Sequence, residues 1–296
     1  MKKPSSDTVF NTFSHILMMT FAILCILPLI LLLTSSFTDN TTLINNGYSF
    51  FPKKWSLSNY TYILQNSQKI FTAYGVSIVL TAVGTFLGTM ITIMLGYGVS
   101  RSEIPGRKII SFLLIFTMLF NGGLVPTYLV YTNILHVKNT FWGLLLPGLL
   151  MNGFNVMLVK SYFKTAVPAE IFEAAEIDGA SEFRKFSSIA LPLAVPIIAT
   201  IALFIGMGYW NDWNNGYVYI STKTNLYSIQ NLLNRMQQNL QFIIQNGASS
   251  GASTNDIPSE GIRMAISVLG IVPVMIVYPW MQRFFIKGIT LGGVKG

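Results

Sequence analysis

The chain has 296 residues, of which 52% are hydrophobic and 10% are charged, and its formal net charge at pH 7 is +8. Soluble domains carry about 25% charged residues, so this composition excludes an ordinary soluble domain and places the chain in a lipid bilayer. The single Cys25 excludes a disulfide framework and a cysteine metal cluster, and the basic residues are too scattered to suggest a nucleic-acid surface.

Six apolar stretches are each long enough to cross the hydrocarbon core, which takes about 20 residues of helix. None of them contains Asp, Glu, Lys or Arg. They cover residues 15–36, 71–98, 109–130, 141–159, 190–211 and 264–282. The first lacks a small-residue cleavage site at Thr34-Ser35-Ser36, so we expect a retained helix rather than a signal peptide. The predicted fold class is an all-α integral membrane protein, with residues 1–296 forming a single six-helix transmembrane domain.

The distribution of basic residues predicts the orientation, because cytoplasmic segments are enriched in Lys and Arg. With the N-terminus inside, seven of the 19 basic residues lie in outer segments, namely Lys53, Lys54, Lys69, Lys138, Lys223, Arg235 and Arg263. The other twelve lie inside, which favours an N-in, C-in topology. In this topology residues 160–189 form a cytoplasmic loop, and residues 37–70 and 212–263 form outer loops.

The two outer loops have different characters. Residues 37–70 are rich in aromatic side chains, including Trp55. In the second loop, apolar residues recur every three or four positions over 225–244, which predicts an amphipathic helix, and the small polar residues of 247–256 predict a flexible link. Either the helix lies on the membrane or on its own bundle, or it contacts an extracellular partner protein.

The cytoplasmic loop contains a charged segment with strong helix signals. Pro168 suits the first turn of a helix, where a missing N–H costs nothing. Glu170 and Glu173 lie near the positive end of the helix dipole, and Ala174 and Ala175 are strong helix formers. These residues predict a short helix along the cytoplasmic face.

The same segment contains signals for a turn and a second helix. Asp178-Gly179 predicts a helix end, with the glycine in the left-handed conformation, and Ser181 can cap a second short helix. Ile171 and Phe172 give the first helix an apolar surface. The residues alone are consistent with either an ordinary interfacial loop or a docking site for a partner.

The chain contains no recognisable motif for nucleotide hydrolysis or for ion coupling. A G-x-x-x-x-G-K-[ST] phosphate loop is absent, and so are H-E-x-x-H and C-x-x-C motifs. Ion-coupled carriers usually hold ionisable residues at membrane depth, and the six apolar stretches contain none. If the chain transports a solute, the free energy must therefore come from a partner.

The segment Glu173-Ala174-Ala175, Gly179, Ile189 and Leu191-Pro192 has the spacing EAA-x3-G-x9-I-x-LP. It resembles the signature of the membrane subunits of bacterial ABC importers, where this loop contacts the ATPase. Further segments are similar to the carbohydrate-importer branch, which includes the maltose-type and complex-saccharide permeases. They are residues 51–60, 121–128, 173–213, 283–288 and 293–296.

This resemblance implies a type I importer fold and a heterodimer with a second, related permease. It also implies a cytoplasmic ATPase dimer, which would hold ATP and Mg while this chain binds no cofactor or metal, and an extracellular solute-binding lipoprotein that delivers an oligosaccharide. No catalytic residue is expected. The residues implied in ATPase coupling are Glu170, Ile171, Phe172, Glu173, Ala174, Ala175, Asp178 and Gly179.

Candidates for the substrate path follow from chemistry, since sugars stack on aromatic rings and hydrogen-bond to amides. The polar and aromatic residues near membrane depth are Asn121, Tyr128, Asn152, Asn155, Tyr209, Trp210 and Asn211. Asn152 and Asn155 are three residues apart and would share one helix face. Each residue can instead form an interhelical hydrogen bond, and membrane depth alone does not separate the two roles. Gly84 and Gly88 predict close helix packing.

Two other functions remain to be compared with oligosaccharide import. A permease of the same superfamily could carry an amino acid, a peptide or phosphate, although the carbohydrate-branch segments argue against it. A secondary carrier or a membrane enzyme would need the intramembrane charges or catalytic groups that the chain lacks.

Overall fold

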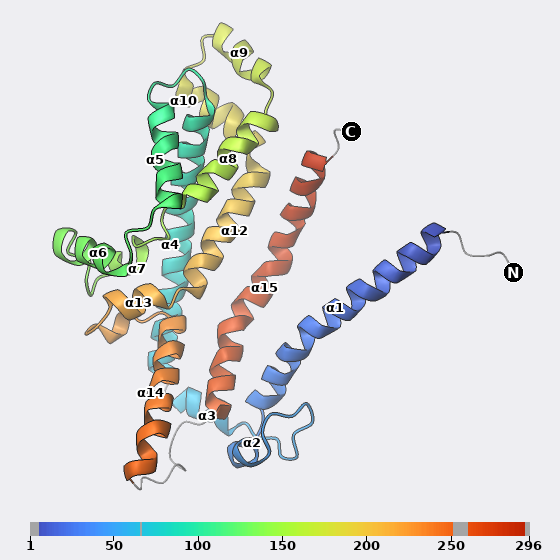
Figure 1. The fold of residues 1–296 in the computed structure, drawn as a ribbon, viewed down its shortest axis with the longest axis vertical. Coiled ribbons are helices and arrows are strands. Elements are labelled where there is room, and N and C mark those ends of the chain that lie inside the picture. Colours follow the sequence, from blue (N-terminus) through green and yellow to red (C-terminus); the bar gives the residue numbers. More distant parts are fainter. Residues whose placement is uncertain (1–5, 66, 251–259, 294–296) are drawn as a thin grey trace, which may run out of the picture. The chain divides into compact units, whose positions relative to one another are not determined.

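The computed structural model describes residues 6–65, 67–250 and 260–293, and nearly all of its regular structure is helical (Figure 1). The chain divides into two compact units. One unit contains residues 1–68 and 233–273, and the other contains residues 69–232 and 274–296. Each unit is described by itself.

The first unit contains α1 (Ser6–Ser36), α2 (Asn40–Asn46), α3 (Ser58–Gln65) and parts of α14 (Ile229–Ser250) and α15 (Glu260–Gly293). Most of α1 is apolar and exposed on all sides, as expected of a helix surrounded by lipid. The loop after α1 is held by the buried amide of Asn59, which donates to the carbonyl oxygens of Ser36 and Thr38 at 3.0 and 3.1 Å.

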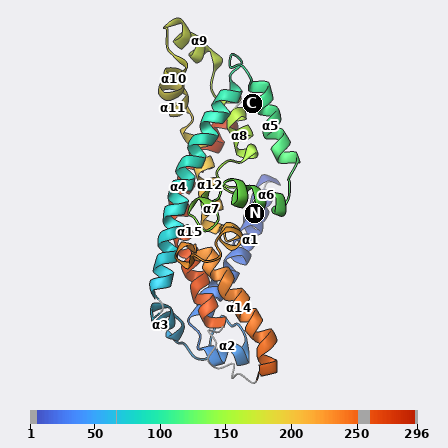
Figure 2. The same ribbon diagram turned by 90° about the vertical axis from the view of Figure 1, so that its left-hand side faces the viewer.

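The second unit contains the bundle that positions the charged loop over residues 160–189 (Figure 2). Besides parts of α14 and α15, its elements are α4 (Ser67–Ser100), α5 (Arg107–Leu119), α6 (Leu124–Leu129), η1 (Val130–Ile134), α7 (Trp142–Leu145), α8 (Gly153–Thr165), α9 (Ala169–Ile177), α10 (Glu182–Lys185), η2 (Phe186–Ala190), α11 (Leu191–Leu193), α12 (Val195–Asn211), α13 (Asn214–Tyr219) and η3 (Thr224–Leu226).

The core of this unit lies where α4, α8 and α12 pack together. Leu80, Val159 and Ile201 are buried members of one hydrophobic cluster. The predicted close packing at Gly84 and Gly88 is confirmed. A Cβ atom at Gly84 would clash with the ring of Tyr209, and one at Gly88 would lie 3.0 Å from the carbonyl oxygen of Leu150. Glycine is therefore required for α12 to approach α4 this closely.

Three helices in the described part of the chain are long and apolar enough to cross a membrane, over Phe10–Ser36, Gln68–Ser100 and Glu260–Pro279. A fourth crossing is possible if Glu182–Leu193 and Val195–Asn211 are counted together, although the two pieces meet at 80°. Proline explains this bend, since Pro192 and Pro196 each remove a backbone donor next to the break at Ala194.

The apolar stretches 109–130 and 141–159 are interrupted, in contrast to the continuous helices over the predicted spans 15–36, 71–98 and 264–282. In the first, α5 ends at Leu119, and Gly123 takes a left-handed φ of 83° before α6 begins. In the second, Gly148 has a φ of 72° and lies between α7 and α8. Bilayer crossing by these two stretches, and with it the six-span topology, stays a prediction.

The amphipathic helix expected over 225–244 is present, but it begins at Ile229 and extends to Ser250 as α14. The flexible link expected over 247–256 therefore starts inside a helix. Its later residues, from 251 on, lie outside the described residues.

Candidate coupling site

The helix predicted from the charged segment is α9, and its C-terminal end has the predicted geometry. Gly179 has a φ of 73°, a conformation that costs other residues free energy. The N–H of Gly179 donates to the carbonyl of Glu176 at 3.0 Å, and the N–H of Ala180 donates to the carbonyl of Ala175 at 2.9 Å. This pair of hydrogen bonds is a Schellman motif, which satisfies the last carbonyls of α9 and turns the chain sharply.

The start of the second helix is also as predicted. The hydroxyl of Ser181 accepts a hydrogen bond from the N–H of Arg184 at 3.4 Å, which caps α10. One detail differs at the start of α9. Pro168 is the N-cap residue, with an extended ψ of 136°, and the first helical residue is Ala169.

One side of α9 is attached to the bundle through Phe172, whose side chain is 3% exposed. The guanidinium of Arg101, the residue that follows α4, lies 4.4 Å from the centre of the Phe172 ring. Tyr97 is 6.1 Å from the same ring and 5.5 Å from Phe163 on α8. The short helix is therefore fixed by a buried aromatic contact that joins it to two bundle helices.

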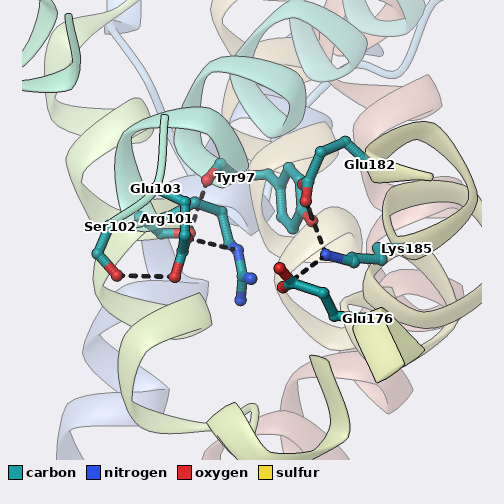
Figure 3. A network of polar contacts seen from close by, with 8 residues as sticks. Tyr97, Arg101, Ser102, Glu103, Glu176, Glu182 and Lys185 are labelled. Carbon is teal, nitrogen blue, oxygen red and sulfur yellow. Dashed lines mark hydrogen bonds and ion pairs between the residues drawn. The ribbon is translucent and has the colours of Figure 1, made fainter. Parts of the chain in front are cut away.

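A polar network fixes the second short helix (Figure 3). Lys185 has a side chain that is only 3% exposed, and its Nζ contacts Glu176 of α9 at 3.0 Å and Glu182 of α10 at 2.9 Å. These two carboxylates raise the pKa of Lys185 through their hydrogen bonds, so the amine stays charged. The hydroxyl of Tyr97 completes the link to α4 by donating to Glu182 at 3.4 Å.

The opposite side of the loop is open. The carboxylates Glu170 and Glu173 are exposed, and neither forms an ion pair within the described residues. Beside them, Ile177 is 87% exposed and Phe183 is 77% exposed. The loop therefore presents acidic and large apolar side chains from a rigid support, a combination that fits binding to another protein.

The eight expected coupling residues have different structural roles. Phe172 is buried and holds the helix, and Gly179 forms the turn. The remaining six are on the helix or at its end, namely Glu170, Ile171, Glu173, Ala174, Ala175 and Asp178; all but the partly buried Ala175 are exposed.

The substrate-path candidates lie in several places in the second unit, and three of them have visible structural roles. The amide oxygen of Asn121 accepts from the N–H of Gly123 at 2.8 Å in the break after α5. That of Asn152 accepts from the N–H of Phe154 at 2.9 Å and caps α8, so Asn152 does not share a helical face with Asn155. The buried Tyr209 donates to the carbonyl of Leu145 at 2.7 Å.

The other four candidates lie in three different environments. Asn155 is buried in α8, and Asn211 is exposed at the end of α12. Trp210 is buried with its ring 6.4 Å from that of Tyr74. Tyr128 stacks on Tyr219 at 5.9 Å, and the amine of Lys138 lies 5.7 Å from the Tyr128 ring.

Comparison with known proteins identifies the family. Residues 1–291 match the family described as "Binding-protein-dependent transport system inner membrane component". The chain belongs to this family. It is therefore a membrane-spanning component of a transport system that works with a solute-binding protein, and the family comprises the permease component of ABC importers.

Two relatives from Bacillus subtilis (strain 168) are each 34% identical to this chain. One is the polygalacturonan/rhamnogalacturonan transport system permease protein YtcP, compared over 98% of this chain and 99% of the relative. The other is the protein LplC, compared over 100% of this chain and 98% of the relative. Both comparisons extend over essentially the whole permease.

A solved structure has the same fold. One chain of a bacterial ABC transporter that imports the acidic polysaccharide alginate is similar to this permease with a TM-score of 0.79. The sequences are 26% identical, and the match covers 96% of this chain and 99% of the other. The permease thus has the all-helical fold of an ABC importer subunit.

Sequence reasoning did not single out the residues that hold the coupling loop of this permease. Lys185, Glu182 and Arg101 belong to no motif of the sequence. A signal was present, because Glu182 and Lys185 are three residues apart and share a helix face. Contact with Tyr97, 85 positions away from Glu182, requires the folded structure.

Proposed function

We propose that this chain is the permease subunit of an ATP-driven importer that takes up an oligosaccharide. Family membership supports the transport role, and the relatives that carry or import polysaccharides support the substrate class. The observation on which the mechanism rests is the coupling loop, which has one buried anchoring side and one exposed side.

The exposed side of α9 and α10 would bind a cytoplasmic ATPase that supplies ATP and Mg, while this chain contributes no nucleotide site. Glu173 and Glu170 suit a basic cleft, and Ile177 and Phe183 would be removed from water on docking. Burial of apolar side chains of this size contributes about 1.5–3 kcal/mol each. The lack of carboxylate ion pairs on this side leaves Glu170 and Glu173 available to the partner.

The buried side would transmit the movement of the ATPase. To transmit a displacement, α9 must be held to the bundle more rigidly than it is held to the ATPase. The contacts that hold it are the Phe172 ring and the ion pairs of Lys185. Closure of an ATPase dimer would therefore move α4 and α8 together with the loop as packed bodies.

The rest of the assembly is inferred from the family. A second, related permease would complete the path, with both termini of this chain on the cytoplasmic side. A solute-binding lipoprotein would deliver the oligosaccharide from outside. The candidate residues of the sugar path are Asn121, Tyr128, Asn152, Asn155, Tyr209, Trp210 and Asn211. Among them, Asn155, Tyr128 and Trp210 are the candidates for direct contact with the sugar.

Uptake by cells tests this function. A strain without this chain should lose uptake of a labelled oligosaccharide, and the wild-type chain should restore it. Glu173→Lys should abolish uptake at an unchanged level of the permease in the membrane, because it reverses the charge offered to the ATPase. Glu173→Gln should cause a smaller loss, of about two- to thirtyfold, the usual range for one coupling contact. Normal uptake with Glu173→Lys would contradict the assignment of α9.

A further inference from the structure

Four basic residues gather at one end of the helix pair α5 and α8. Arg107 and Lys108 are the first residues of α5, and Lys160 and Lys164 lie in the last two turns of α8. The helices lie side by side and run antiparallel (Figures 1 and 2). The Nζ of Lys160 donates to the hydroxyl of Ser111 at 3.1 Å, which brings the basic ends of the two helices together.

No carboxylate within the described residues forms an ion pair with these four cations. The five ion pairs of the described residues involve Lys54, Arg101, Lys185 and Arg263, and none includes a basic residue of α5 or α8. Burial, followed by the positive charges of Lys164 and Arg107, lowers the pKa of Lys160. The cluster therefore repels itself, in contrast to Lys185, whose two carboxylates raise its pKa.

The surface next to the cluster is apolar. On α5, Ile109, Phe112 and Leu113 are between 52% and 66% exposed. In a membrane protein such side chains face acyl chains rather than water. A ligand that suits both features has an anionic head group and hydrocarbon chains.

We propose that Arg107, Lys160 and Lys164 bind the phosphate of an anionic phospholipid whose acyl chains lie along the exposed side of α5. Basic sites between helices at a membrane surface recognise such head groups, and each Lys or Arg near the surface contributes about a fivefold gain in affinity. The lipid phosphate supplies a counter-charge that the described residues do not provide, and it would thereby hold α5 against α8 at the end nearest the coupling loop.

Spin-labelled lipids test the proposal on the full-length chain. The protein is reconstituted in phosphatidylcholine vesicles with a trace of spin-labelled phosphatidylglycerol or spin-labelled phosphatidylcholine, and the immobilised fraction of each label is measured. We expect a preference for phosphatidylglycerol that falls about fivefold in Lys164→Gln and disappears in the triple variant Arg107→Gln/Lys160→Gln/Lys164→Gln.

The matched control removes the same charge elsewhere. Lys53→Gln/Lys69→Gln/Lys223→Gln neutralises three exposed lysines of the predicted outer loops and should keep the preference. An equal loss in this control, or an unchanged preference in the α5–α8 triple variant, would overturn the proposal. Displacement of labelled phosphatidylglycerol by inorganic phosphate would also overturn it, because a free anion would then be the ligand. If the triple variant does not fold, the exposed Lys164→Gln change decides alone.

Discussion

Buried polar groups at the coupling loop and along α4 differ in their partners, although the Nε of Arg101, next to the loop, also has no hydrogen-bond partner within the described residues. At the coupling loop, the deeply buried Lys185 has two carboxylate partners. Along α4 and just beyond α12, buried polar atoms lack a partner in the described part of the chain. They are the hydroxyls of Thr81, Thr85, Thr89 and Thr92 and the Oδ2 of Asp212.

This difference in hydrogen bonding indicates which part of the unit adopts a single conformation. A satisfied network stabilises a single arrangement, whereas an unpaired buried group costs free energy unless water, a solute, another chain or another conformation supplies its partner. We therefore expect the coupling loop to move as one body, and we expect the hydrogen bonds of the α4 hydroxyls and of Asp212 to change during transport.

The largest expected effect comes from loosening the coupling loop. Phe172→Ala should lower the free energy for local opening of α9 by about 3–5 kcal/mol, because it empties the aromatic contact with Tyr97 and Arg101. Hydrogen exchange of the α9 backbone amides measures this opening, and uptake should fall with it.

Phe183→Ala is the matched control on the exposed side. Since Phe183 is 77% exposed, its removal should leave the exchange of α9 unchanged while weakening the binding of the ATPase. If both changes affect exchange equally, the division of the loop into an anchoring side and a docking side is incorrect.

A smaller effect is expected at the turn between α9 and α10. Gly179→Ala should destabilise the loop by about 1–2 kcal/mol, because a residue with a Cβ atom resists the left-handed conformation. Gly98→Ala provides the comparison, since no atom lies within 4 Å of the added Cβ and the residue is inside α4. Thermal unfolding should show a loss for the first variant and none for the second.

The smallest effect is expected at Asp212, whose carboxyl group is one of the buried groups with an unpartnered atom within the described residues. Burial raises the pKa of Asp212, so the folded protein binds this proton more tightly than the unfolded chain does. Stability due to this group therefore falls as the pH rises from the ordinary carboxyl range through the raised pKa.

Asp212→Asn removes the charge and keeps an oxygen that can accept from the N–H groups of Asn214 and Asn215. The variant should unfold at a higher temperature than wild type at pH 7.5, and the gap should shrink as the pH is lowered toward 4. A gap that is independent of pH would show that folding does not raise the pKa of Asp212.

Local signals predicted the coupling loop well. Glycine at 179 and serine at 181 determine a turn and a cap through their own backbone and side chain, and the structure confirms both. The interruptions in the apolar stretches 109–130 and 141–159 were not predicted. An average hydrophobicity shows how long an apolar stretch is, but it does not show where a helix inside the stretch ends. Asn121-Gly122-Gly123 and Pro147-Gly148 are the turn residues that signal them.

The anchoring contacts could not be predicted in this way. Whether Phe172 faces the bundle or the partner depends on the position of Arg101 and Tyr97, which lie more than 70 positions earlier in the chain. The burial of Lys185 likewise depends on how α9 folds back on α10. Contacts between distant segments are set by packing, and a single sequence contains no local pattern for them.

Cross-linking tests the central claim that the exposed side of α9 is the joint with the ATPase. In a Cys25→Ser background, which removes the only native cysteine, a thiol-reactive cross-linker is applied to Glu173→Cys and to Lys138→Cys in membranes that contain the ATPase. The account predicts a covalent product with the ATPase from position 173 and none from position 138. A product from neither position, or equal products from both, would contradict it.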